Sequence, residues 1–204
     1  MDTRAFDFTV FGGIIGDLLA YLDVTLVVAL ISIALGSLLG MALAGVKIAG
    51  SSWAKGLVNI YTYVMRCTPS IVLLFIVFYG LPVLVRGLFN YSINDMHRAV
   101  FAIITFALLF GAYISEVFRA AYLAVSRGQY EAAVSIGIKP WQAVWHVILP
   151  QAARIALPNF GNSVINLLKE GSLAYTIGLI DMLGRGNMII AQHYGAYGIE
   201  TYLA

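Results

Sequence analysis

Long runs of hydrophobic residues, separated by short polar stretches, dominate the pattern along this chain. The first run, residues 24–46, contains no charged side chain and is followed by Lys47. A helix needs about 20 apolar residues to cross the roughly 30 Å hydrocarbon core of a bilayer, so this run predicts a membrane span. Four further apolar runs follow, at 70–85, 99–118, 152–168 and 189–204. The pattern therefore predicts an all-α integral membrane protein with about five transmembrane helices.

The segments between these runs predict loops and amphipathic pieces. Residues 47–55 predict a short loop with lysine at both ends, and residues 86–98 predict a polar loop. Residues 56–65 form an amphipathic, interfacial pattern ahead of Pro69, which is expected to begin or kink the second span. Gly36 and Gly40 have a spacing that lets two helices approach closely, which indicates packing.

The distribution of lysine and arginine predicts the orientation in the membrane. Basic residues concentrate in 47–55 and 119–154, whereas the opposite loops carry fewer basic residues and several aspartates. Cytoplasmic loops are enriched in Lys and Arg, so 119–154 is expected inside and the N-terminus outside. With five spans the C-terminus would be cytoplasmic. Because the sequence stops within an apolar run, we expect a C-terminal tail to be missing.

Composition supports a membrane protein and excludes several classes. The chain has 204 residues, of which 61% are hydrophobic and 11% charged, and its mean hydropathy is +0.88. A soluble domain with a solvated surface would not have such values. The basic residues form no run, so nucleic-acid binding has no support. A single cysteine, Cys67, excludes an internal disulfide and a CxxC site. The N-terminus lacks a signal-peptide cleavage pattern, so its first apolar segment is expected to remain.

Residues 129–152 interrupt the apolar pattern with a short, punctuated helical segment. Gly137 suits the left-handed end of one helix, and Pro140 suits the first turn of the next, which Pro150 is expected to end. One apolar stripe contains Trp141, Val144, Trp145, Ile148 and Leu149. Periodicity leaves two interpretations open: a helix lying in the headgroup layer, or a docking element for a soluble partner.

The residues of this segment also carry a family resemblance. Glu131-Ala132-Ala133 is followed after three residues by Gly137, and after nine more by Val147-Ile148-Leu149-Pro150. This spacing resembles the EAA motif of the permease subunits of bacterial ABC importers, with Val147 where the family prefers Ile. The stretches RCTPS, AYISEVFRAA and LLKEGSLAYTIG resemble elements of the polar amino-acid branch, so the resemblance covers nearly the whole chain. It implies one transmembrane permease domain over 1–204, with the type I importer fold and coupling helices within about 126–150.

The resemblance further implies the partners of the chain. Seven residues are expected at the contact with a cytoplasmic ATPase subunit: Glu131, Ala132, Ala133, Gly137, Pro140, Leu149 and Pro150. Two ATPase copies, a second permease copy or paralogue, an extracytoplasmic substrate-binding protein and the lipid bilayer would surround the chain in the bacterial cytoplasmic (inner) membrane. Lys139 departs from the Ser or Thr often found before this proline, which predicts a weaker helix cap.

The sequence contains no arrangement that predicts catalysis. A P-loop needs adjacent Gly and Lys, and the nearest match, residues 40–47, lacks this and falls in a predicted span. Gly161-Asn162-Ser163 lacks the second glycine of a serine-nucleophile turn, and no His, Cys or acidic pair has metal-site spacing. The chain is therefore not expected to be an enzyme or to hold a cofactor. ATP and Mg²⁺ are expected on the partner ATPase.

Ionisable residues at membrane depth are costly, so they are candidates for a substrate pathway. Lys169 and Glu170 match the two charges of an amino-acid zwitterion, although capping of the fourth span at the outer interface is an equal alternative. Glu116 and Arg119, three residues apart, fit an ion pair better than a pathway, and Arg66 fits an interfacial anchor or a pathway. The candidate set is Arg66, Thr68, Glu116, Asn162, Ser163, Asn166, Lys169, Glu170 and Ser172.

The expected function follows from the resemblance. Residues 178–204 look most like the cystine-type members of the branch. We therefore expect the permease subunit of an ATP-driven importer of polar amino acids, with L-cystine or a related sulfur amino acid as the best guess. The alternative is a passive amino-acid or ion channel or facilitator, in which 119–154 is only an interfacial element and flux needs no ATP.

Overall fold

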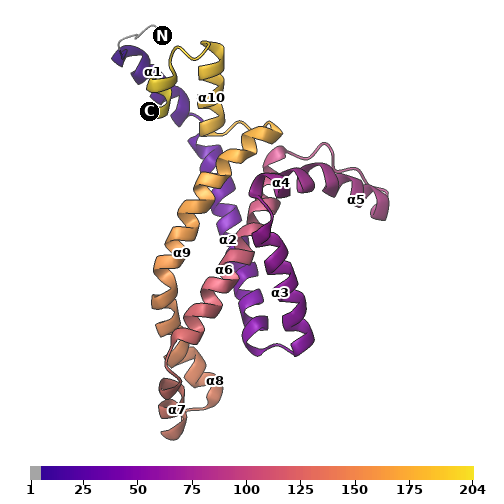
Figure 1. Ribbon diagram of the computed structural model, residues 1–204, viewed down its shortest axis with the longest axis vertical. Coiled ribbons are helices and arrows are strands. Elements are labelled where there is room, and N and C mark those ends of the chain that lie inside the picture. Colours follow the sequence, from indigo (N-terminus) through magenta and orange to yellow (C-terminus); the bar gives the residue numbers. More distant parts are fainter. Residues whose placement is uncertain (1–5) are drawn as a thin grey trace.

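The fold is built around three long helices that lie side by side (Figure 1): α2 (Leu22–Ala49), α6 (Arg98–Ala124) and α9 (Leu149–Gly171). The computed structural model describes residues 6–204, and in this part of the chain all regular elements are helical. Glycine brings α2 and α6 together, because a Cβ added at Gly36 would stand 2.9 Å from the Ala107 carbonyl oxygen. One at Gly40 would stand 2.9 Å from Ile114 Cγ2. The packing role expected for these two glycines is confirmed.

Helix α3 (Ser52–Cys67) runs antiparallel to α2 and lies beside α6 (Figure 1). The loop predicted at 47–55 is wrong, because α2 continues to Ala49 and the connection is a tight turn at Gly50 and Ser51. The helix can continue because the Lys47 side chain is buried against polar partners instead of reaching into water. Ser51 Oγ then begins α3 by accepting a hydrogen bond from the Ala54 amide at 3.4 Å.

The apolar run after Pro69 forms one continuous helical segment, Ser70–Phe89, made of α4 (Ser70–Phe75), the π-helical turn η1 (Ile76–Gly80) and α5 (Leu81–Phe89). Pro69 is the N-cap residue of α4, so it begins a helix as expected. Figure 1 shows this segment running across the end of α3 instead of continuing along it. The polar loop predicted at 86–98 is too long, since the helix continues to Phe89 and ends at Asn90, whose φ is 52°.

Within the described residues, three helices are long and apolar enough to cross a bilayer: Leu22–Ala49, Ser70–Phe89 and Arg98–Ala124. Helix α9, with 23 residues, contains the predicted span at 152–168 but is not among these three. On α2, Leu30 and Leu38 are among the large apolar side chains that are exposed. Such a surface suits contact with lipid tails.

The 126–150 block projects beyond the long helices at one end of the molecule (Figure 1). It contains α7 (Arg127–Ser135), α8 (Pro140–Ala143) and the π-helical turn η2 (Val144–Ile148), so the predicted helix, turn and helix are confirmed. Pro150 does not end the second helix, because it lies in the first turn of α9 and η2 leads directly into it. The Pro150 nitrogen carries no hydrogen, so one intrahelical bond is missing where η2 passes into α9. Pro158 also lies inside α9 and does not break it.

The predicted fifth span at 189–204 is wrong for the described residues. After η3 (Ser172–Ile177), the chain forms α10 (Met182–Gln192) and a six-residue helix, α11 (Gly198–Leu203). Tyr194 and Gly195, with φ of 53° and 84°, break the helical path between them. Apolar composition alone could not reveal this turn.

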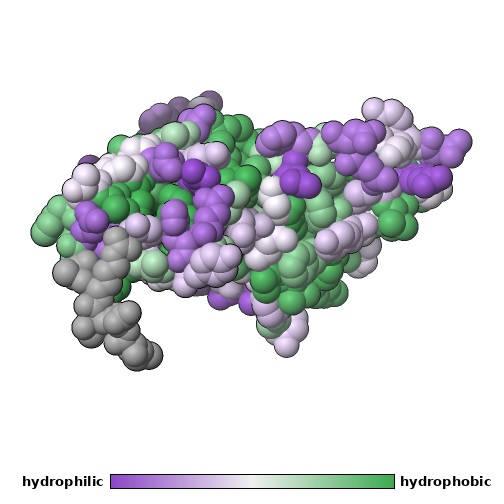
Figure 2. Space-filling model, turned by 90° about the horizontal axis from the view of Figure 1, so that it is seen from above, coloured by the Kyte–Doolittle hydropathy of each residue, from purple (hydrophilic) through white to green (hydrophobic). Residues whose placement is uncertain are grey.

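Helices α10 and α11 pack against α1 (Phe8–Leu19), at the end of the molecule opposite the 126–150 block (Figure 1). The Asp7 amide donates to Glu200 Oε1 at 3.2 Å, so the two ends of the described chain lie together. They do not lie at opposite ends, as five spans would require. Figure 2, which looks onto this end, shows hydrophilic side chains over much of it and hydrophobic ones between them and along the flank.

A core of aromatic and branched side chains holds α2, α4, α6 and α9 together. Phe101, Phe106 and Ile114 of α6 and Leu74 of α4 are almost fully buried, and Leu167 of α9 joins the same cluster. Most of α6 is therefore enclosed by the other helices. Polar groups on α6 that face this enclosed region are candidates for function.

Candidate substrate cavity and coupling block

The turn between α7 and α8 depends on one glycine. Gly137 has a φ of 88°, a left-handed conformation, and its amide donates to the Val134 carbonyl at 3.0 Å. The Ile138 amide donates to the Ala133 carbonyl at 3.2 Å, which completes a glycine-ended helix terminus. A Cβ added at Gly137 would meet no atom within 4 Å, so the requirement is conformational and not spatial.

The EAA residues present a small, exposed surface on α7. Glu131 and Ala132 are exposed, whereas Ala133 is buried against the rest of the block. At the start of α8 the Lys139 amide donates to Gln142 Oε1 at 3.3 Å. Gln142 thus satisfies the amide of the cap residue, whereas the Lys139 side chain, which has no acceptor, satisfies none of the first amides of the helix. Leu149 is half-buried and Pro150 is exposed at the beginning of α9.

The block is attached to the long helices by a small apolar cluster. Val125, which follows α6, packs with Ile148 and Ala152. Gln151 of α9 donates to the Val147 carbonyl at 2.9 Å and reaches Gln129 of α7 at 3.5 Å. The block is therefore joined to both α6 and α9.

The single apolar stripe predicted on the second helix is wrong. Ile148 is 5% exposed, but Trp141 and Trp145 are 59% and 65% exposed. The buried positions include Ala143 instead. The π-helical turn η2 explains the difference, because a wider turn moves Ile148, at its end, off the face that Trp141 and Trp145 share.

A polar cavity of about 330 Å³ opens between α6 and α9. Ser163, Asn166, Lys169 and Glu170, four of the predicted pathway residues, line it from α9. The remaining lining residues, all but one from α6, are Leu109, Phe110, Tyr113 and Leu167. The structure thus brings together the charged pair and two of the hydrogen-bonding groups that the sequence predicted on the same helix.

The groups in the polar cavity keep much of their bonding capacity. No ion pair involving Lys169 or Glu170 occurs within residues 6–204. Adjacent residues on a helix do not face each other, so these two charges cannot neutralise one another. Ser163 Oγ donates to the Asn159 carbonyl at 2.9 Å and retains its lone pairs as acceptors. The cavity therefore offers a cation, an anion and polar groups to a ligand.

The other predicted pathway residues lie outside this cavity or at its edge. Arg66 lies at the edge, with its guanidinium carbon 5.4 Å from the centre of the Tyr113 ring. The hydroxyls of Thr68 and Ser172 donate to carbonyls of their own helical turns, at 2.8 and 2.7 Å. Asn162 is exposed and does not line the cavity.

Sequence reasoning missed Tyr113 as a cavity residue. Its signal was a hydroxyl-bearing aromatic side chain within the apolar run AYISEVF, three residues before Glu116. In hydrocarbon such a hydroxyl needs a polar partner. The predicted pathway set contained only charged, amide and aliphatic hydroxyl side chains, so an aromatic residue with a hydroxyl was left out.

Glu116 belongs to a separate cluster, nearer the 126–150 block. Arg119 Nε donates to Glu116 Oε2 at 2.9 Å, which confirms the predicted ion pair, and Lys47 Nζ binds the other carboxylate oxygen. Lys47 Nζ also donates to Thr62 Oγ1 at 2.8 Å. Lys47 was missed because it was assigned to a loop. A second cavity, of about 320 Å³, is lined by Lys47, Lys55, Asn59, Glu116 and Arg119; we call it the basic cavity.

Comparison with known proteins identifies the family. Residues 33–198 match the family described as "Binding-protein-dependent transport system inner membrane component". The chain belongs to this family. Its assignment to the ABC importer permeases, made above from the EAA spacing, is confirmed. So is the all-α permease fold.

Relatives and a solved structure extend over almost the whole chain. The L-cystine transport system permease protein TcyL of Bacillus subtilis (strain 168) is 41% identical over 201 residues, 98% of this chain and 83% of TcyL. The probable amino-acid ABC transporter permease protein PatM of Vibrio harveyi is 34% identical over 200 residues, 98% and 86% of the two chains. A crystal structure of an amino acid ABC transporter with histidines superposes with a TM-score of 0.81 at 28% identity, covering 98% of this chain and 91% of the other.

Proposed function

We propose that this chain is the membrane-spanning permease subunit of an ATP-driven importer of polar amino acids. One observation carries the proposal: α6 and α9, which line the polar cavity, both lead directly into the 126–150 block. A displacement of that block would therefore change the separation of the cavity walls. This is what an importer needs in order to couple an external energy source to substrate access.

The 126–150 block supplies the contact for a cytoplasmic ATPase. Glu131, Ala132, Gly137, Pro140, Leu149 and Pro150 form the coupling surface in this proposal, whereas Ala133, also expected at the contact, is buried within the block and packs beneath that surface. The exposed Glu131 carboxylate and the small Ala132 allow a close approach by a partner groove. Two ATPase copies hold ATP and Mg²⁺, a second permease copy or paralogue completes the pathway, and an extracytoplasmic binding protein delivers the substrate. The block then faces the cytoplasm, and the end with α1 and α10 faces outward.

The polar cavity supplies the substrate class. A zwitterionic amino acid requires an anionic partner for its ammonium group and a cationic partner for its carboxylate. Glu170 and Lys169 provide these charges, and Asn166 and Ser163 provide hydrogen bonds. The volume of about 330 Å³ lies in the range of about 300–1,000 Å³ that is usual for small-molecule sites. Because TcyL is named an L-cystine permease, L-cystine is the first substrate to test.

The coupling role is tested by affinity purification of the tagged protein from its native membrane. We expect a soluble ATPase to copurify with the natural chain and to be lost from Glu131→Arg. The matched control is Asp95→Arg, which makes the same charge change at an exposed residue in the loop between α5 and α6. Loss of the ATPase from both variants, or from neither, would contradict a specific contact at Glu131.

The substrate class is tested by uptake of radiolabelled L-cystine into membrane vesicles, with unlabelled amino acids as competitors. ATP-dependent uptake that polar amino acids inhibit would support the proposal. If polar amino acids other than cystine inhibit the uptake more strongly than unlabelled cystine, the substrate class is still polar amino acids but the preferred substrate is not cystine. Uptake that persists without ATP would instead support a passive facilitator.

A further inference from the structure

The basic cavity has an excess of positive charge that its own residues do not balance. Three cationic side chains, Lys47, Lys55 and Arg119, share it with one carboxylate, Glu116. That carboxylate uses one oxygen for Lys47 and the other for Arg119. Within residues 6–204 no acidic side chain forms an ion pair with Lys55. An open cavity with this charge imbalance favours an anionic ligand.

The hydrogen-bond donors that remain in the basic cavity suit a phosphate. Arg119 binds Glu116 only through Nε, so the two terminal nitrogens of its planar guanidinium remain as donors. Lys55 adds an ammonium group, and the Asn59 side-chain amide adds a neutral donor. Guanidinium and ammonium groups together are the usual partners of phosphate oxygens in proteins.

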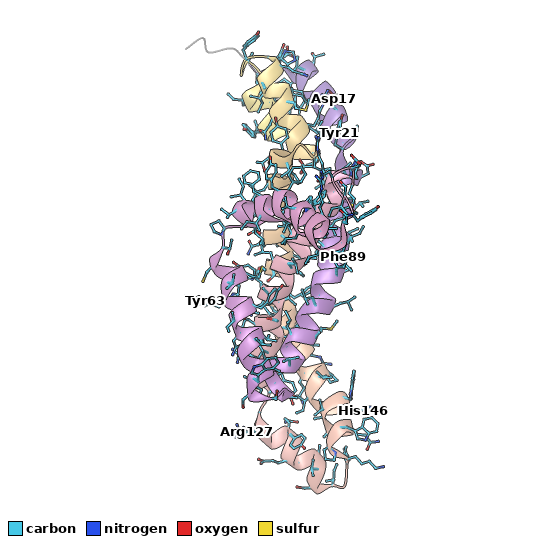
Figure 3. All side chains as sticks on the ribbon, turned by 90° about the vertical axis from the view of Figure 1, so that its right-hand side faces the viewer. Asp17, Tyr21, Tyr63, Phe89, Arg127 and His146 are labelled. Atoms are coloured by element: carbon cyan, nitrogen blue, oxygen red, sulfur yellow. The ribbon has the colours of Figure 1, made fainter. Side chains whose placement is uncertain are left out.

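The position of the basic cavity points to a lipid as the source of that phosphate. It lies near the turn that joins α2 and α3, the end of this hairpin closest to the 126–150 block (Figure 1). Figure 3 shows the same hairpin, with Tyr63 farther along α3 and with Arg127 and His146 on the block beyond it. The cavity is therefore close to one end of the membrane-length helices and not at their middle.

The side chains around the α2–α3 turn indicate the headgroup layer. Trp53, in the first turn of α3, is 76% exposed, and tryptophan is enriched where membrane meets water. Lys55 follows within the same turn, and the exposed Leu57 and Ile60 come next along α3. This order, from an interfacial aromatic and a cation to exposed apolar residues, matches the passage from headgroups to hydrocarbon.

We propose that the basic cavity binds the phosphate of an acidic phospholipid headgroup, in the leaflet next to the 126–150 block. Lys55, Arg119 and Asn59 hold the phosphate, while Lys47 and Glu116 keep the Arg119 guanidinium in place. The cavity volume of about 320 Å³ accommodates a phosphate with part of its glycerol. Free phosphate has the same chemistry, so the experiment has to separate the two sources.

The experiment measures lipid retention on the natural protein with its copurifying subunits. The complex is placed in bilayer discs of mixed phosphatidylcholine and phosphatidylglycerol. It is then released from the discs, and the lipid that stays bound to the protein is identified by native mass spectrometry. We expect preferential retention of phosphatidylglycerol, reduced roughly fivefold by Lys55→Gln, because one basic residue near an anionic surface contributes about that factor. Asn59→Asp, which puts a carboxylate among the phosphate oxygens, is expected to abolish the preference.

Arg154→Gln is the matched control, because it also removes one positive charge, from an exposed side chain that does not line the cavity. We expect this variant to retain phosphatidylglycerol as the natural protein does. Equal losses in Lys55→Gln and Arg154→Gln would overturn the site in favour of general attraction to an anionic surface. Binding of inorganic phosphate in discs of pure phosphatidylcholine would overturn the lipid assignment. The readout does not depend on transport, so its outcome is separate from that of the proposed function.

Discussion

The two polar clusters of this protein use the same kinds of side chain in opposite ways. In the basic cavity, Glu116 is bound by Lys47 and Arg119, which come from different helices. In the polar cavity, Lys169 and Glu170 are neighbours in the sequence but form no ion pair with each other. Opposite charges neutralise each other only when the helix geometry brings the charged groups of the two side chains into contact. The Glu116 carboxylate is therefore neutralised within the protein, whereas the Lys169 and Glu170 side chains form no ion pair with each other.

The largest expected effect is the loss of Glu116. Glu116→Gln leaves Lys47, whose side chain is only 2% exposed, without its charged partner. Breaking a buried ion pair from one side costs about 3 kcal/mol, so we expect a clear fall in the unfolding temperature of the purified protein. Glu170→Gln is the matched comparison and should change stability by less than about 0.5 kcal/mol.

The double variant Lys47→Met with Glu116→Leu sharpens this test. Replacing both members of a buried pair with apolar groups is often close to neutral, so we expect it to recover much of the lost stability. Equal unfolding temperatures for Glu116→Gln and Glu170→Gln would contradict the claim that only the Glu116 ion pair contributes to stability.

The next largest effect concerns transport. Lys169→Gln removes the cation assigned to the substrate carboxylate, and a hydrogen bond to a charged group contributes about 1.5–3 kcal/mol. We therefore expect the KM for uptake to rise roughly tenfold to hundredfold, with an unchanged unfolding temperature. Arg86→Gln, a loss of one exposed cation on α5, should leave KM unchanged. A normal KM in Lys169→Gln would favour a capping role for this lysine.

A smaller effect on stability is expected at Thr62. This hydroxyl is buried and accepts a hydrogen bond from Lys47 Nζ at 2.8 Å. Thr62→Val keeps the shape and loses the acceptor, at a cost of about 1–1.5 kcal/mol, measured as a fall in unfolding temperature. Ser163→Ala, in the polar cavity, should cost less, because its hydroxyl donates only within its own helix. A larger loss of stability in Ser163→Ala than in Thr62→Val would contradict the structural role of the Lys47–Glu116–Thr62 cluster.

The smallest effect is expected at Arg66, which reaches the polar cavity only through the Tyr113 ring. A partly exposed cation–π contact contributes about 0.5–1 kcal/mol, so Arg66→Gln should raise the KM for uptake roughly twofold to fivefold. Arg66→Lys keeps the charge and should have a smaller effect. A rise as large as that of Lys169→Gln would place Arg66 in direct contact with the substrate.

Features that depend on a few neighbouring residues were predictable from the sequence. Gly137 and Pro140 predicted the turn of the 126–150 block, and the left-handed φ of 88° at Gly137 agrees with that prediction. Ser163, Asn166, Lys169 and Glu170 share one helix, so their meeting at one cavity followed from helical spacing. The EAA spacing was sufficient to assign the family.

Features that depend on distant residues were not predictable. Lys47 was expected in a loop because a lysine at the end of an apolar run usually reaches water. Its actual partners, Glu116 and Thr62, are 69 and 15 residues away. The prediction that Trp141, Trp145 and Ile148 share one apolar stripe failed for a different reason. A π-helical turn cannot be recognised from a 3.6-residue pattern.

The sequence by itself determined the membrane class, the helical fold and the helix, turn and helix of the 126–150 block, because hydrocarbon burial and short-range backbone preferences act on consecutive residues. The EAA spacing determined the family. Only the tertiary structure decided which charges are paired and which are free. It placed Glu116 between Lys47 and Arg119, and it opened Lys169 and Glu170 toward Tyr113 on another helix. The free energy of a charge at membrane depth is set by the groups within a few ångströms of it, and those groups come from helices that are far apart along the chain.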